Sequence, residues 1–366
     1  MSANIFEKYA KLLVDYSLKI KKGDRLLINS TYLAEPLIKE VYKHALKNGA
    51  NVEFKIAFNG MGKIFYDNAG DDQLKYIPEL YKHAVENFEA VLSINAPFNL
   101  KETQSVSSEK KKIVNMANAS VSKRFMQRSA EGALKWSYCE FPTDAGAQES
   151  QMSRDEYENF VYGACFLYDD DPCARWEELK NNQQKWVDYL AKRKIIRFVN
   201  KDSDVSFSVA DRIWINSSGD ANMPSGEVFT APVEDSVNGK IRFSYPGIFM
   251  GLEIEDISLE IKNGEVVKWD ARKGRELLDN VFSIPGARRF GEVAIGTNYG
   301  IQRFIKNMLF DEKIGGTIHM AVGAAYPHTR GTNESSVHWD LLADMKDGGE
   351  IYADGELIYK NGKFII

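Results

Sequence analysis

Hydrophobic and polar residues follow helical and extended patterns in turn along the first hundred positions. Tyr9, Leu12 and Tyr16 share one stripe at helical spacing, and Leu37 and Val41 repeat that spacing further along. Short apolar or alternating runs lie between these stretches and indicate strands. The predicted order is a helix over 5–19, a strand over 25–29, a helix over 36–48, a strand over 51–57, a helix over 79–87 and a strand over 90–94. This rhythm favours a parallel sheet covered by helices.

The pattern changes from helices to strands near Asn200. Residues 153–193 have helical spacing, with Pro172 between two helices. From residue 195 onward, apolar runs predict strands over 195–199, 205–209, 239–245 and 254–261, and a hairpin over 351–359 that turns at Asp354-Gly355. We therefore predict an α/β protein. An N-terminal parallel-sheet α/β domain would cover 1–200, and a strand-rich α+β metal-binding domain would cover 201–366.

Composition narrows the class of protein. The 366 residues suffice for two domains, and a net charge of −5 gives no reason to expect a nucleic-acid partner. No G-x-G-x-x-G follows the first predicted strand, so no dinucleotide cofactor is expected. Three scattered cysteines fit a reducing cytoplasm. We expect no membrane association, because no apolar run reaches the roughly 18 residues that a spanning helix needs.

Acidic residues and histidines recur within apolar stretches of the last third of the chain. A carboxylate in such surroundings is costly unless it is paired or bound to a metal. Glu227 and Glu292 are both in this position, and His319 lies in an apolar run. His338 and Asp340 are two positions apart, so in a strand they face the same side. Tyr326 adds a phenol to these side chains. The candidate metal ligands are therefore Glu227, Glu292, His319, Tyr326, His338 and Asp340.

These donors suit borderline divalent cations such as Zn²⁺, Co²⁺ or Mn²⁺. A single catalytic zinc usually takes three protein ligands, so five or six candidates fit two ions that share a carboxylate. Two such ions would activate water and polarise a carbonyl group, which predicts metal-assisted hydrolysis. The other histidines are weaker candidates. His44 and His83 fall in helical patterns and are expected at the surface, and His328 lies in a loop after Tyr326-Pro327.

Four segments of the chain resemble the aminopeptidase T / aminopeptidase S (PepS-like) family of dinuclear metallo-aminopeptidases. In order, they are 222–232, 291–294, 319–327 and 338–340. Four separated motifs in the right order are a specific signal, whereas any one alone is weak. The resemblance implies a cytoplasmic homodimer of broad specificity. Its substrates would be peptides with a free N-terminus, from which it removes the terminal residue.

The resemblance also implies roles for the candidate ligands. Each chain would hold two divalent ions of Zn, Co, Mn or Mg, with Glu227 as the expected bridge between them. A tyrosine, here Tyr326, would adjoin the metals. The expected catalytic residues are Glu292 and Tyr326. From the chemistry of the site, Glu292 or another carboxylate near the bridging water would shuttle its proton, and Tyr326 would donate to the developing oxyanion.

Two other functions fit some of the same residues. Ring-cleaving 2,5-dihydroxypyridine dioxygenases are similar in overall fold but bind one Fe(II), for which His319, His338 and Asp340 would suffice. The presence of both Glu227 and Glu292 favours two metals and hydrolysis instead. A non-catalytic binding protein is the third possibility, and the complete ligand set argues against it. Counting metals separates the first two functions, since one needs two ions and the other a single redox-active iron.

Overall fold

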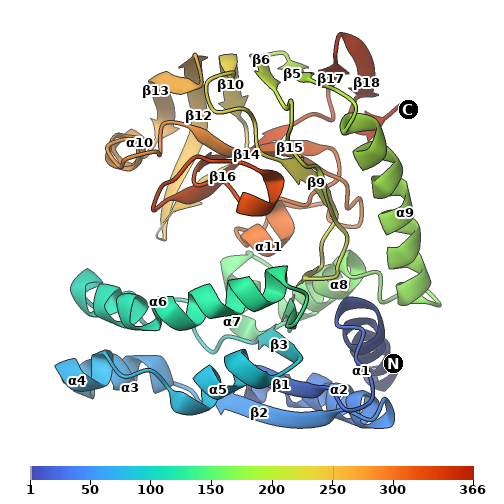
Figure 1. Cartoon of the computed structure of the whole chain (residues 1–366), viewed down its shortest axis with the longest axis vertical. Helices are drawn as coiled ribbons and strands as arrows, with labels where there is room; N and C mark the ends of the chain where they lie inside the picture. The colour runs from blue at the N-terminus through green and yellow to red at the C-terminus, as the bar shows by residue number, and fades with distance from the viewer. Residues whose placement is uncertain (1, 250) are drawn as a thin grey trace. The chain divides into compact units, whose positions relative to one another are not determined.

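The structure is a computed structural model that describes residues 2–249 and 251–366 (Figure 1). The chain forms two compact units. The first comprises Met1–Arg175 and Gly219–Pro224, and the second comprises Trp176–Ser218 and Ser225–Ile366. Because residues 219–224 belong to the first unit, no single position divides the two. The domain division at residues 1–200 and 201–366 stays a prediction.

The first unit contains a parallel sheet, as the alternating pattern predicts. Its strand order is β2-β1-β3-β4-β8, and every neighbouring pair is parallel. The strands are β1 (Arg25–Thr31), β2 (Asn51–Ala57), β3 (Ala90–Asn95), β4 (Lys135–Glu140) and β8 (Asn222–Met223). The three strands predicted in this part of the chain are confirmed, with ends displaced by at most two residues.

Helices link these strands, because parallel neighbours need long crossover connections. They are α1 (Ser2–Lys11), α2 (Glu35–Lys47), α3 (Met61–Asn68), α4 (Asp71–Leu74), α5 (Glu79–Asn87), α6 (Ser108–Ala130), α7 (Asp144–Glu149) and α8 (Arg154–Ala164). The helix predicted over 5–19 differs in detail, since α1 begins at Ser2 and continues as a π-helix over Leu12–Ser17. An apolar stripe predicts helix but does not distinguish the two windings. A capping box between Ser153 and Glu156 starts α8.

The second unit begins within α9 (Pro172–Leu190) and contains two sheets. The larger runs β11-β12-β10-β6-β5-β17-β18-β19, with β13 paired to β12. Its strands are β5 (Ile195–Asn200), β6 (Ser203–Ser208), β10 (Asn238–Phe243), β11 (Gly247–Phe249), β12 (Leu252–Lys262), β13 (Glu265–Lys273), β17 (Glu350–Ala353), β18 (Glu356–Lys360) and β19 (Lys363–Phe364). The strands predicted from residue 195 onward and the 351–359 hairpin are confirmed.

The smaller sheet of the second unit is antiparallel and carries the candidate ligands. Its order is β16-β15-β14-β9-β7. The strands are β7 (Ile215–Ser217), β9 (Glu227–Thr230), β14 (Phe290–Gly296), β15 (Thr317–Gly323) and β16 (His338–Asp344). The short helix α11 (Met308–Asp311) lies between β14 and β15 in the chain, and α10 (Arg275–Val281) packs against β12 and β13 of the larger sheet. One continuous hydrophobic core contains residues of both sheets, such as Phe198 and Ile241 from the larger and Val293 and Met320 from the smaller. The two sheets therefore pack face to face.

Candidate metal centre

The register of the smaller sheet brings the candidate ligands to one face. Glu292 on β14 and Asp340 on β16 are both paired with Ala321 on β15, so the three residues form a row across the sheet. In the next row, two residues along each strand, Ala294 is paired with His319. Because side chains two positions apart point to the same side of a strand, these carboxylates and the imidazole share a face.

Two further candidate ligands extend the same face in both directions. Glu227 on β9 is paired with Gly296, and His338 on β16 is paired with Gly323. Neither glycine adds a side chain beside the ligand. The opposite face of the sheet is apolar and lies in the hydrophobic core; its members include Val228, Val293, Ile295, Ile318, Met320, Val322, Trp339 and Leu341. The alternation of the sequence thus separates a polar site from the core.

The turn before β9 depends on a glycine. Gly226 has a φ of +116°, a conformation that L side chains rarely adopt, and a Cβ there would lie 2.7 Å from Asn298 Cβ. The carbonyl oxygen of the next residue, Glu227, accepts a hydrogen bond of 2.8 Å from Gln183 Nε2 of α9. Gln183 is fully buried. The Pro-Ser-Gly turn and this amide together fix the strand end that carries Glu227.

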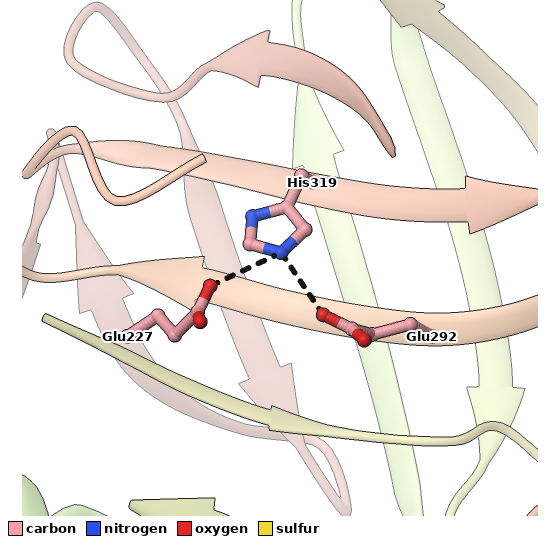
Figure 2. Close-up of side chains that lie close together, drawn as sticks. All are labelled: Glu227, Glu292 and His319. Atoms are coloured by element: carbon pink, nitrogen blue, oxygen red, sulfur yellow. Dashed lines mark hydrogen bonds and ion pairs between the residues drawn. The ribbon is translucent and has the colours of Figure 1, made fainter. Parts of the chain in front are cut away.

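Three of the candidate ligands form a tight group (Figure 2). Suitable donor atoms of Glu227, Glu292 and His319 all lie within 4.8 Å of one another. His319 Nε2 is 3.1 Å from Glu292 Oε1 and 3.4 Å from Glu227 Oε2. Figure 2 shows the two carboxylates, from β9 and β14, directed at the same ring nitrogen.

A second group adjoins the first through Glu292. His338 Nε2 lies 3.7 Å from Glu292 Oε2 and 3.7 Å from Asp340 Oδ2. His338 Nδ1 lies 2.8 Å from Ala324 O, and since a carbonyl only accepts, this nitrogen donates. In the neutral ring Nε2 is then free to bind a metal, and such a backbone partner is the usual support of a histidine ligand. Glu292 therefore has one oxygen toward each histidine.

Burial makes this cluster unfavourable without a cation. His319 is fully buried, and Glu227, Glu292 and Asp340 are each at most 8% exposed. Burial and the adjacent Glu227 carboxylate raise the pKa of Glu292 well above its usual range, and burial with the Glu312 and Glu292 carboxylates raises the pKa of Asp340 to about 7. Among the described residues, no hydrogen bond reaches Glu227 Oε2, Asp340 Oδ1 or His319 Nδ1. Buried carboxylates that lie close together, with oxygen atoms that accept no hydrogen bond, are suited to binding divalent cations.

Tyr326 lies beside this cluster rather than in the core. Its ring centroid is 4.7 Å from that of His338, and 37% of the residue is exposed. Partial burial and the Glu292 carboxylate raise the pKa of the Tyr326 phenol, so the hydroxyl group keeps its proton at neutral pH. His328 stacks on Tyr326 with centroids 5.4 Å apart, and Phe229 lies edge-on to both rings. These rings form an aromatic margin to the site.

Two charged residues at the site were missed by the sequence analysis. Lys313 is fully buried, with Nζ 3.4 Å from Glu227 Oε1 and in contact with Glu312 Oε1. Burial lowers the pKa of Lys313, but the Glu227 and Glu312 carboxylates outweigh burial and the pKa is raised. A lysine before a Gly-Gly turn usually indicates a solvent-exposed loop. Only its closeness in sequence to His319 gave any signal.

The other histidines of the chain lie in the first unit or outside the cluster. His44 on α2 has Nε2 2.9 Å from Asp15 Oδ2, and His83 on α5 is exposed. His83 therefore lies at the surface as predicted, whereas His44 is half-buried. All three cysteines are free thiols. Among the described residues, none of the helices has the length and apolar character needed to cross a membrane.

Comparison with protein families identifies the chain. Residues 2–364 match Peptidase_M29, described as thermophilic metalloprotease (M29). The chain belongs to the M29 family. This confirms the resemblance drawn from the four sequence motifs, and a metalloprotease family requires the divalent metal that the buried cluster is suited to hold. The dioxygenase and binding-protein alternatives are not favoured by this membership.

Curated proteins similar to this M29 chain are named as aminopeptidases. Aminopeptidase 2 of Geobacillus stearothermophilus is 29% identical, over 98% of this chain and 97% of that protein. Aminopeptidase AmpS of Bacillus subtilis is 26% identical over 97% of each. The solved structure of wild-type AmpT from Thermus thermophilus is 24% identical and covers 99% of each chain with a TM-score of 0.84. The predicted α/β fold is therefore confirmed over the whole chain.

Proposed function

We propose that this M29 chain removes N-terminal residues from peptides with two divalent ions held on one face of the smaller sheet. The chain is a metal-dependent aminopeptidase, in keeping with its family and with the activities for which its relatives are named. The number of ions and the ligand set are our proposal. It rests on one observation, that Glu292 directs its two oxygens to two different histidines.

The proposed ligands divide into two sets. Glu227 and His319 would hold one ion, and His338 and Asp340 the other. Glu292 would bind both ions, because Oε1 faces His319 and Oε2 faces His338. This assignment replaces Glu227 as the expected bridge. The donors suit Zn²⁺, Co²⁺ or Mn²⁺, with Mg²⁺ a weaker match because it prefers an all-oxygen shell.

The chain's own residues account for orientation and charge. Bound divalent ions supply Lewis acidity and lower the pKa of water. Beside the proposed ions, the hydrogen bond that His338 Nδ1 donates to the backbone oxygen of Ala324 fixes the ring so that Nε2 faces the carboxylates. Tyr326 keeps a neutral hydroxyl group beside His338, where it can donate to an oxyanion. The proton shuttle expected of Glu292 stays a prediction.

Metal removal and substrate blocking test the proposed function. Chelation should abolish hydrolysis of aminoacyl-anilides, and each metal added back alone should show which one restores it. A peptide with a free N-terminus should be cleaved, whereas its N-acetylated twin should be a very poor substrate, because the free amine orients the substrate. Equal turnover of both peptides would contradict exopeptidase action.

We also propose that two copies associate through the outer edge of the parallel sheet. β2 is a terminal strand, and Phe54, Ile56 and the following Phe58 are 45%, 41% and 55% exposed. Exposed apolar side chains on an edge strand favour pairing with another chain, and a second copy pairs about a twofold axis. Phe54→Glu should therefore shift sedimentation from dimer toward monomer. A monomeric wild-type chain would contradict the proposal.

A cytoplasmic location is part of the same proposal. It is supported by the three free thiols, two of which, Cys139 and Cys165, are buried. Free cysteines are typical of reducing compartments. Fractionation of cells that express the chain would test it, and recovery with secreted proteins would contradict it.

A further inference from the structure

A buried lysine occupies one side of the carboxylate cluster. Lys313 follows α11 and is fully buried. Its Nζ lies between two carboxylates, 3.4 Å from Glu227 Oε1 on one side and in contact with Glu312 Oε1 on the other. An unpaired ammonium would be costly to bury, so these two contacts explain how the side chain is accommodated. The contact with Glu227 reaches a proposed metal ligand.

The backbone that carries Lys313 is tied to the strand end that carries Glu227. Asn298 makes the connection, since its N–H donates to Lys313 O at 3.0 Å and its Nδ2 donates to Ser225 O at 2.9 Å. Asn298 is fully buried. Buried networks with satisfied partners are rigid. The ammonium and the carboxylate are therefore held at a fixed separation.

The two oxygens of Glu227 face different partners. Oε1 faces the ammonium, whereas Oε2 lies 3.4 Å from His319 Nε2 and receives no hydrogen bond from the described residues. We propose that Lys313 is a positioning residue that holds Glu227 Oε1 and leaves Oε2 as the one oxygen of this carboxylate for an ion. The inference rests on the proposed ligand role of Glu227. It explains why Glu227 serves one ion while Glu292, with both oxygens directed at histidines, serves two.

A cation beside a metal ligand can act in two opposite ways. By charge alone, the Lys313 ammonium would repel a divalent ion, so its removal would tighten metal binding. By position, it would orient the ligand, and loss of such a contact typically weakens metal binding about 10–100-fold. The carboxylate of Glu312 on the far side of the ammonium offsets its charge. The geometry therefore favours the positioning effect.

Calorimetric titration of the metal-free full chain with Zn²⁺ alone distinguishes these effects. Lys313→Met should weaken one of two binding events about 10–100-fold and leave the other largely unchanged. The Lys313→Met, Glu227→Gln double variant should bind no more weakly than Glu227→Gln, because Lys313 acts through Glu227. With Co²⁺ as the probe, the visible absorption of one ion should change in Lys313→Met. Lys313→Gln, which keeps an N–H donor, should lose less affinity than Lys313→Met.

Specific outcomes would overturn the inference. Equal or tighter Zn²⁺ binding in Lys313→Met would do so, as would additive losses in the double variant, which would mean that Lys313 supports the fold alone. If Lys313→Met does not fold, Lys313→Met combined with Glu312→Gln takes its place, because it also removes the charge of the carboxylate left without a partner. Wild-type affinity for both ions in that variant would reject the positioning role. Wild-type binding in Glu227→Gln would instead reject the proposed ligand set, so the two failures are distinguishable.

Discussion

Glu292 and Asp340 stand two strands apart, with only the methyl group of Ala321 between them in the row across the sheet. Neighbouring strands are about 4.8 Å apart, so the two residues have roughly twice that spacing at the backbone. Even so, one carboxylate oxygen of each lies 3.7 Å from His338 Nε2. A small residue at this position would leave room between them for the proposed ions. The proposed metal site therefore depends both on the alternation along each strand and on the register between strands.

Enlarging Ala321 should block the site. Ala321→Leu is expected to abolish metal binding because the added atoms would occupy the space between the two carboxylates. Ala321 is fully buried, so overpacking should also cost about 1–3 kcal/mol of stability. Elemental analysis after metal reconstitution, with the thermal unfolding midpoint measured alongside, checks this. Ala321→Ser is the matched control and should keep both ions; full metal content in Ala321→Leu would contradict the proposed location.

Substitutions of the two glutamates should have unequal effects on metal content. Glu292→Gln is expected to reduce binding of both ions, because its oxygens face both histidines. Glu227→Gln should reduce binding of one, since its free oxygen faces only His319. Ions per chain can be counted after dialysis against a fixed free metal concentration. The reverse ranking would restore Glu227 as the bridge.

Histidine substitutions should separate ligands from surface residues. His319→Ala and His338→Ala should each lose metal affinity and nearly all activity, because each removes a nitrogen directed at carboxylates. His44→Ala and His83→Ala are the matched controls in the first unit and should keep both, since their partners are Asp15 and Asn87. Activity and bound metal are measured on the same samples. Inactive His44→Ala with intact metal would reveal a catalytic group outside the proposed site.

Much of this arrangement was predictable from local sequence. The strand alternation placed His338 and Asp340 on one face, and the structure confirms that β16 contains both. Apolar neighbours likewise indicated that Glu227, Glu292 and His319 are buried, and they are. These predictions needed only a strand's period of two and the cost of burying charge.

Other features depend on contacts between distant segments. Strand register decides that Glu292 lies opposite Ala321 and that Glu227 lies opposite Gly296, and no local pattern gives register between strands. One oxygen of Glu227 faces Lys313 and the other accepts no hydrogen bond from the described residues, and this difference depends on a loop whose sequence resembles an exposed turn. For this reason the sequence suggested Glu227 as the bridge, while the geometry favours Glu292.

Tyr326→Phe tests the phenol beside His338. If its hydroxyl group donates to the oxyanion, the variant should lose kcat by about 10²–10³-fold, the usual effect of removing one such donor. KM should change little, because the hydrogen bond would form mainly in the transition state. Phenylalanine keeps the ring, whose centroid lies 4.7 Å from that of His338 and 5.4 Å from that of His328, so packing should be preserved.

Metal content decides how the Tyr326→Phe result is understood. Normal kcat would mean that the ring acts by packing alone. A lower kcat with both ions bound would support donation, because only the hydroxyl group has been removed. A lower kcat together with lost metal would make the phenol a sixth ligand, as the sequence first suggested, and the oxyanion role would then have to be given up. His328→Ala is the control for the aromatic margin, since it removes the ring stacked on Tyr326 but leaves the hydroxyl group in place; it should lower kcat less than Tyr326→Phe.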